Sequence, residues 1–211
     1  MRRSVGFLFA ITLAWTANAT TLRGAGGGVI SGTVTGTGLP DGADTVVFIE
    51  EAAAATPPST PVEMDQRGYQ FIPKVLPIVS GTTVRFLNND QVGHNVFSPD
   101  YEKYDLGTWN QGQMKDYAFR ACTKAPCVYT QLCKAHPQMD GYIVVLQNQY
   151  FAVTDKRGHY EIRNVPPGKY TVGIWHARRY QAASKMVTVG GDATSSLDFQ
   201  LSRARLAPSV N

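Results

Sequence analysis

The chain has 211 residues, of which 43% are hydrophobic and 17% charged, and its formal net charge is +4. This composition can bury one sizeable core or two small ones. The basic excess is too small to indicate binding to nucleic acid, so we expect no nucleic-acid partner.

The N-terminus has the three regions of a secretory signal peptide. Arg2 and Arg3 form the charged start, Val5 to Trp15 the apolar run, and Ala17-Asn18-Ala19 the cleavage site. The apolar run is well under the roughly 20 residues that cross a bilayer. We therefore expect residues 1–19 to be removed and the protein to be periplasmic, with no transmembrane segment in the mature chain. Without the two arginines, 18 basic residues stand against 16 acidic ones, a net charge of +2. The alternative is an uncleaved anchor.

Short apolar runs, rich in β-branched residues and separated by Gly and Pro, follow along the chain. No stretch has a sustained 3.6-residue period, and Ala52 to Ala55 is followed at once by prolines that break any helix. The pattern predicts an all-β chain. The expected strands are Val29 to Val34, Thr45 to Ile49, Thr83 to Leu87, Asn95 to Ser98, Cys127 to Leu132, Tyr142 to Leu146, Tyr160 to Ile162, Tyr170 to Trp175 and Met186 to Val189.

The two ends of the chain look like parts of one unit. Ile30 to Glu51 is a strand, a Gly-rich turn and a second strand, and Phe151 to His176 supplies further hairpins. Together with Lys185 to Leu201, these pieces resemble the carboxypeptidase regulatory-like β-sandwich, which has a transthyretin-like fold. The motifs that carry the resemblance are Thr154-Asp155-x-x-Gly158 and Val165-Pro-Pro-Gly168-x-Tyr170.

This resemblance implies that residues 28–53 and 149–203 form a small transthyretin-like sandwich, which residues 54–148 interrupt as an inserted domain. Insertions at exposed hairpin tips are tolerated because they disturb little buried backbone. The alternative is two consecutive domains, with Ile30 to Glu51 belonging to the middle one.

The middle segment contains a group of residues suited to copper. Cys133, His136 and Met139 form a Cys-x2-His-x2-Met loop that leads directly into an apolar strand. A thiolate, two imidazoles and a weak thioether ligand suit both copper oxidation states, so one more histidine is needed. Of the four histidines, His94 is the natural candidate because it begins a strand after the turn at Asn88 to Asp90. Zinc is a poorer match because a methionine such as Met139 is not among the thiolate, imidazole and carboxylate ligands that zinc prefers.

This combination resembles the cupredoxins, the small blue copper proteins, and its ligand loop is spaced like that of amicyanin. The resemblance extends over Phe71 to Asp90 and Lys103 to Gln113, as in exported proteins associated with methylamine utilisation. It implies a Greek-key β-sandwich that holds one type 1 copper ion and carries single electrons to a transient redox partner, such as a cytochrome or a dehydrogenase. It also implies that Asn95 hydrogen-bonds across to the cysteine segment and that electrons leave through His136.

An exported chain meets an oxidising compartment where thiols pair, so one of the three cysteines must be left over. Cys122 and Cys127 flank a short segment where cupredoxins usually have a Pro-Gly turn. A disulfide across a hairpin of that length is geometrically plausible. This pairing leaves Cys133 free as a thiolate.

Four protein ligands leave no open position for a substrate, so we expect no enzymatic turnover. The main alternative function is copper storage or delivery by the same ligands without electron transfer. In a third hypothesis the flanking sandwich binds a glycan or a partner, which Tyr170, Trp175 and Tyr180 permit. His159 and His176 are expected to have structural or solvated roles.

Overall fold

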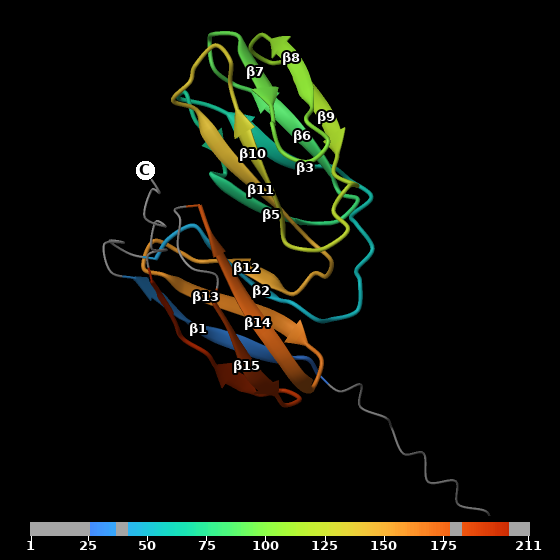
Figure 1. Cartoon of the computed structure of the whole chain (residues 1–211), viewed down its shortest axis with the longest axis vertical. Helices are drawn as coiled ribbons and strands as arrows, with labels where there is room; N and C mark the ends of the chain where they lie inside the picture. The colour runs from blue at the N-terminus through green and yellow to red at the C-terminus, as the bar shows by residue number, and fades with distance from the viewer. Residues whose placement is uncertain (1–25, 37–41, 178–182, 203–211) are drawn as a thin grey trace, which may run out of the picture.

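The computed structural model describes residues 26–36, 42–177 and 183–202. All regular elements in these residues are β-strands, so the predicted all-β class is confirmed. Figure 1 shows the strands of residues 62–146 in one half of the molecule and the remaining strands in the other half. Within these ranges, no helix is long and apolar enough to span a membrane. The predicted signal peptide, residues 1–19, lies outside them.

Residues 62–146 form a sandwich of two sheets. The strands of one sheet are, in spatial order, β4 (Phe71–Ile72), β3 (Val62–Gln66), β6 (Thr83–Asn88) and β9 (Met114–Ala118). Those of the other are β5 (Val75–Val79), β11 (Asp140–Leu146), β10 (Cys127–Leu132), β7 (His94–Phe97) and β8 (Asp105–Trp109). An apolar core between the two sheets includes the fully buried rings of Phe71, Phe86, Phe119 and Tyr129.

A second, smaller sandwich combines both ends of the described chain. Its inner sheet has the order β12 (Phe151–Val153), β2 (Thr45–Ile49), β14 (Gly168–His176) and β15 (Ala183–Val189). In the outer sheet, β1 (Gly28–Gly36) pairs with β13 (His159–Val165), β16 (Thr194–Ser196) and β17 (Phe199–Leu201). The chain therefore leaves this sandwich after β2 and returns to it at β12.

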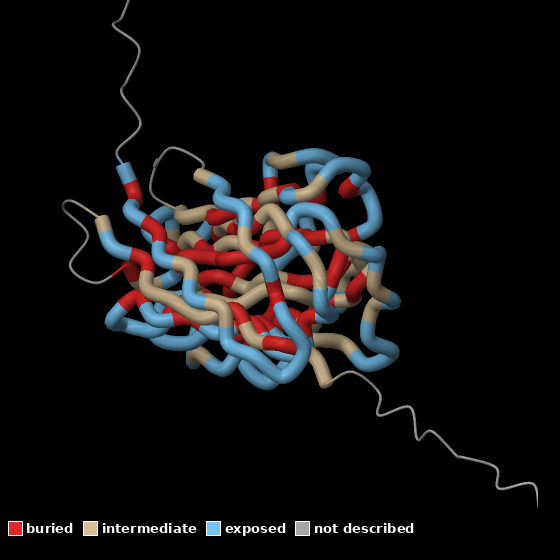
Figure 2. Tube along the Cα trace, turned by 90° about the horizontal axis from the view of Figure 1, so that it is seen from below, coloured by how far each residue is buried: buried red, intermediate tan, exposed pale blue. Residues whose placement is uncertain are grey.

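The two sandwiches pack on each other through the sheets that contain β2 and β11. Successive side chains of a strand point to opposite faces, and in these two strands both faces are covered. This double burial explains their uninterrupted apolar sequences. The four sheets are thus stacked with three apolar cores between them, and Figure 2 shows the buried residues running through the interior. The residues that β2 and β11 contribute to the interface between the sandwiches are Val46, Phe48, Val144 and Leu146.

Several strands are not predicted by the sequence pattern. In β3, Asp65 and Gln66 are buried polar residues, which obscure the apolar alternation; they bond to the side chain of Asn89 and the carbonyl of Leu87. Strand β5 contains Pro77, which cannot donate a backbone hydrogen bond, and it is tolerated because β5 lies at the edge of its sheet. Strands β8 and β9 are also at sheet edges and largely exposed, so neither shows a core-facing pattern.

Candidate metal centre

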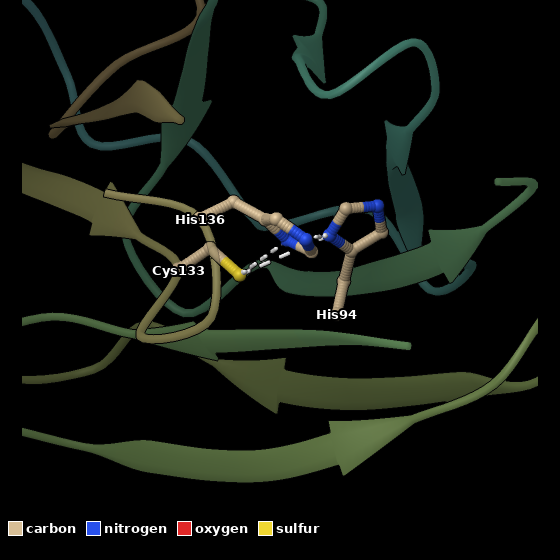
Figure 3. Close-up of side chains that lie close together, drawn as sticks. All are labelled: His94, Cys133 and His136. Atoms are coloured by element: carbon tan, nitrogen blue, oxygen red, sulfur yellow. Dashed lines mark hydrogen bonds between the residues drawn. The ribbon is translucent and has the colours of Figure 1, made fainter. Parts of the chain in front are cut away.

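Strand pairing brings three of the predicted ligands to one end of the larger sandwich. Strand β10 pairs along its whole length with residues 140–145 of β11, which leaves residues 133–139 as the loop between them. Strand β7 runs antiparallel to β10 and pairs with its last residue, so the start of β7 lies beside this loop. Figure 3 shows Cys133 and His136 of the loop facing His94 of β7.

The potential metal-binding atoms of these residues form a small triangle. The Sγ atom of Cys133 lies 3.8 Å from Nδ1 of His94 and 3.6 Å from Nδ1 of His136, and the two Nδ1 atoms are 3.0 Å apart. The circumradius of this triangle is about 2.0 Å, close to the ~2.0–2.3 Å of metal bonds to nitrogen and sulfur. The group can therefore hold one metal ion, and its donor set of sulfur and imidazole nitrogen suits copper.

Burial differs among the four predicted ligands. His94 is 0% exposed, Cys133 3% and Met139 1%, whereas His136 is only partly buried. Met139 belongs to the same apolar core as Cys133. Its N–H donates to the carbonyl of His136 at 2.9 Å, which fixes the end of the loop. His136 is therefore the ligand nearest to solvent.

Asn95 connects the cysteine segment to β7 and β8. Its backbone N–H points at Sγ of Cys133, 3.4 Å away, and its side-chain oxygen accepts the N–H of Lys134 at 3.4 Å. Its Nδ2 donates to the carboxylate of Asp105 at 2.7 Å and to the carbonyl of Gly107 at 3.0 Å. Asn95 therefore contacts the sulfur through its backbone and holds the segment after Cys133 through its side chain.

Asp90, which the sequence indicates only as part of a turn, orients His94. Its Oδ2 lies 2.7 Å from Nε2 of His94, and its two oxygens accept the N–H groups of Gly68 and Tyr69 at 2.6 and 3.0 Å. Burial acts to raise the pKa of Asp90, but the hydrogen bonds from Tyr69, Gly68 and His94 outweigh it and lower the pKa. The ionised carboxylate can only accept, so His94 carries its hydrogen on Nε2. In a neutral imidazole that carries its hydrogen on Nε2, Nδ1 is the nitrogen that can bind a metal.

Tyr69 lies at the rim of the centre and is also absent from the sequence prediction. Its ring meets the rings of His136 and His94 edge-on, with centroids 5.0 and 5.8 Å apart. Tyr69 is 44% exposed. The backbone φ of 57° is in the left-handed region, which is uncommon for an aromatic residue. The hydrogen bond from its N–H to Asp90 fixes this turn, so one carboxylate both orients a ligand and holds the aromatic ring beside it.

An ion pair anchors the segment that follows Cys133. The ammonium group of Lys134 lies 2.5 Å from a carboxylate oxygen of Asp105. Hydrogen bonding from Lys134, the N–H of Gly107 and the side chain of Asn95 lowers the pKa of Asp105 to about 2. Both partners of the ion pair are exposed to solvent, which screens the interaction.

The difference in unfolding free energy between the metal-free wild type and Asp105→Asn should depend on pH. The pKa of Asp105 is about 2 in the fold against an ordinary value of 3.8. Its carboxylate therefore stabilises the fold above about pH 4, and this contribution is lost as the pH falls from about 4 to about 2. Denaturant unfolding of both proteins across this range measures the effect. A difference that does not change with pH would contradict it.

The cysteines are divided between a disulfide and a free thiol. Cys122 and Cys127 form a disulfide, and Cys133 is free and buried. The predicted disulfide is therefore confirmed. It closes the turn that enters β10, the strand that leads to Cys133, and leaves that thiol available.

The other two histidines lie away from this group. His159 is exposed at the start of β13, and its N–H donates to the side chain of Asp155 at 2.9 Å. His176 ends β14, with its Nε2 3.1 Å from the carbonyl of Ala43. Among the described residues, the group of possible metal ligands contains neither of them.

Comparison with known proteins gives a family match to the C-terminal part of the chain. Residues 138–202 match the model of the carboxypeptidase regulatory-like domain. This resemblance is confirmed. The matched range omits β1 and β2, which pair with its strands, and includes β11, which pairs with β5 and β10. We call β1, β2 and β12–β17 the regulatory-like sandwich, and β3–β11 the ligand-bearing sandwich. No curated protein matches the chain.

Cupredoxins are among the solved structures to which the chain is similar. A Cu-containing nitrite reductase from Thermus scotoductus SA-01 is 29% identical, with a TM-score of 0.38 over 48% of this chain and 26% of that one. The chain thus spans about a quarter of the reductase. A purple cupredoxin from Nitrosopumilus maritimus is 27% identical, with a TM-score of 0.35 over 40% of this chain and 98% of that one. A reduced variant of amicyanin is 23% identical, with a TM-score of 0.37 over 47% and 97%.

Proposed function

We propose that the chain is a periplasmic electron carrier that holds one type 1 copper ion between His94, Cys133, His136 and Met139. The observation that carries this proposal is the buried thiol of Cys133, which faces the Nδ1 atoms of two histidines at 3.8 and 3.6 Å. When bound, copper supplies a one-electron couple whose potential is tuned by the sulfur ligands.

The contacts around the ligands favour electron transfer over metal storage. Asp90 fixes the hydrogen and the ring orientation of His94, and Asn95 holds the segment of Cys133. Ligands locked by packing and outer hydrogen bonds keep their geometry. A centre of this kind rearranges little when its charge changes by one, which is what rapid electron exchange needs.

His136 is the least buried ligand, and we place the exit of the electron there. Tyr69 and Val92, which are 44% and 36% exposed, line a hollow of about 430 Å³ that also contacts Asp90. We expect a cytochrome or a dehydrogenase to touch this side transiently. Contacts between redox partners of this kind are small, below about 1,200 Å² in total.

The proposal includes the limits of the two domains and the absence of turnover. Residues 28–53 and 149–203 would form the regulatory-like domain, and residues 54–148 the inserted copper domain, because the chain leaves one sandwich after β2 and returns at β12. Four protein ligands leave no position for a substrate on the metal. We therefore expect no enzymatic activity.

Reconstitution of the purified protein with Cu(II) tests the function. We expect one copper per chain and an intense visible band that bleaches with ascorbate and returns on reoxidation, as a blue copper site requires. A colourless protein would overturn the proposal. A protein that loses copper irreversibly on reduction would instead be a storage or delivery protein.

Met139→Gln should retain copper and the visible band but lower the reduction potential. Met139 is buried at the end of the ligand loop, and a weak thioether ligand stabilises Cu(I) more than an amide oxygen does. Spectroelectrochemical titration of both proteins measures the shift. An unchanged potential would show that the thioether does not bind the metal.

A further inference from the structure

A chain of contacts holds the end of the ligand loop and reaches into the regulatory-like sandwich. Asp140 directly follows Met139, and Lys74 contacts both its carbonyl, at 2.8 Å, and its carboxylate. The hydroxyl of Tyr142 donates to the other carboxylate oxygen at 2.9 Å. The ring of Tyr142 in turn lies 5.4 Å from the ring of Trp175, which is on β14.

Two side chains, those of Lys74 and Trp175, contact the ring of Tyr142. The ammonium group of Lys74 lies 5.8 Å from the ring centroid, within the range of cation–π attraction. Trp175 supplies an aromatic contact whose centroid distance lies within the 4.5–7 Å that such pairs prefer. Because the ring is fixed, its hydroxyl is directed at Asp140.

Trp175 is held by a different sandwich from the one that carries the ligands. It pairs with Val46 of β2 and packs against the core between the two sandwiches. The cysteine end of the loop, by contrast, is anchored within the ligand-bearing sandwich through Lys134, Asn95 and Asp105. The Met139 end is also held within that sandwich, by Lys74, but it has an additional contact with the regulatory-like sandwich through Tyr142 and Trp175.

We propose that Trp175 is a positioning residue for the metal centre: by fixing Tyr142 it holds Asp140, and with it the Met139 end of the ligand loop. The effect of Trp175 on copper rests on the proposed function. The contacts from Trp175 to Asp140, however, are present in the metal-free protein. The regulatory-like sandwich is then part of the scaffold of the centre. Loss of Trp175 should change the Met139 side of the site and leave Cys133 and the two histidines in place.

Amide hydrogen exchange in the metal-free protein tests the contact directly. In Trp175→Ala and in Tyr142→Phe, the N–H of Met139 should exchange about tenfold faster or more, because local opening becomes easier. Trp175→Phe, which keeps an aromatic ring, should exchange close to the wild type. Leu146→Ala is the matched control, since Leu146 is buried in the same interface at the opposite end of β11. It should lower the unfolding temperature without accelerating exchange at Met139.

The copper-loaded variants give a second readout. Trp175→Ala should keep one copper but shift its reduction potential and the shape of its visible band, whereas Leu146→Ala should leave both unchanged. Equal exchange rates at Met139 in Trp175→Ala and Leu146→Ala would overturn the positioning role. A wild type that binds no copper would overturn the proposed function alone. The exchange measurement uses the metal-free protein, so it would still show whether Trp175 holds the Met139 end of the loop.

Discussion

Cys133→Ser is expected to abolish the intense visible absorption of the copper-loaded protein and to weaken copper binding. The Sγ atom of Cys133 faces both imidazole Nδ1 atoms, at 3.6 and 3.8 Å, and the residue is 3% exposed. A serine hydroxyl is neutral at ordinary pH and is a hard ligand, so it replaces neither the charge nor the softness of the thiolate. We expect copper affinity to fall by more than the roughly 10–100-fold that follows the loss of an outer contact.

Visible spectra and copper titrations of the wild type and Cys133→Ser measure this effect. The control is the double variant Cys122→Ser/Cys127→Ser, which removes the disulfide but leaves the third cysteine. That control should unfold more easily and still develop the band. A Cys133→Ser protein that stays coloured, or a colourless double variant that is still folded, would contradict the assignment of the ligands.

The residues of the loop could be predicted from sequence because their relation is local. Cys133, His136 and Met139 occupy one short loop between two paired strands, so their spacing alone brings them to one end of the sheet. His94 could be chosen because the chain offers few histidines and this one begins a strand. The structure places His94, Cys133 and His136 within one group.

The contacts of Asp90 and Tyr69 could not be predicted because they depend on pairing between distant segments. Strands β3 and β6 run parallel, with Gln66 opposite Asn88. This register brings the turn after β3 beside the turn after β6, so that Gly68 and Tyr69 can donate to Asp90. Neither turn contains a sequence pattern that predicts which other segment lies beside it. From sequence alone, a role for Asp90 at the site is indicated only by its position four residues before His94.

The stacking of the two sandwiches has the same origin. The apolar sequences of β2 and β11 indicate strands that are buried on both faces, but they do not predict which sheet packs against each face. In the structure each strand covers the other's sheet, although about 90 residues separate them in the chain. The contact between Tyr142 and Trp175 depends on this packing and was therefore not accessible from local sequence.

Asp90→Ala should lower copper affinity by about 10–100-fold, the usual cost of removing the partner of a metal-binding histidine. The substitution leaves Nε2 of His94 and the amides of Gly68 and Tyr69 without their acceptor. A buried donor without a partner costs about 1–3 kcal/mol, so the metal-free fold should also be less stable. Once Nε2 has no acceptor, the hydrogen can move to Nδ1, where it competes with the metal.

Nitrogen NMR of His94 in the metal-free protein distinguishes this mechanism from general loss of stability. The wild type should carry its hydrogen on Nε2, and Asp90→Ala should show a mixture of both forms. Asp116→Asn is the matched control, because Asp116 is an ionised carboxylate paired with Arg85 away from the ligands. It should change neither the hydrogen position nor the affinity. If Asp90→Ala kept the hydrogen on Nε2 and bound copper like the wild type, the carboxylate would only support the turn that carries Tyr69. The mixture together with weaker binding would mean that Asp90 prepares the ligand before the metal arrives.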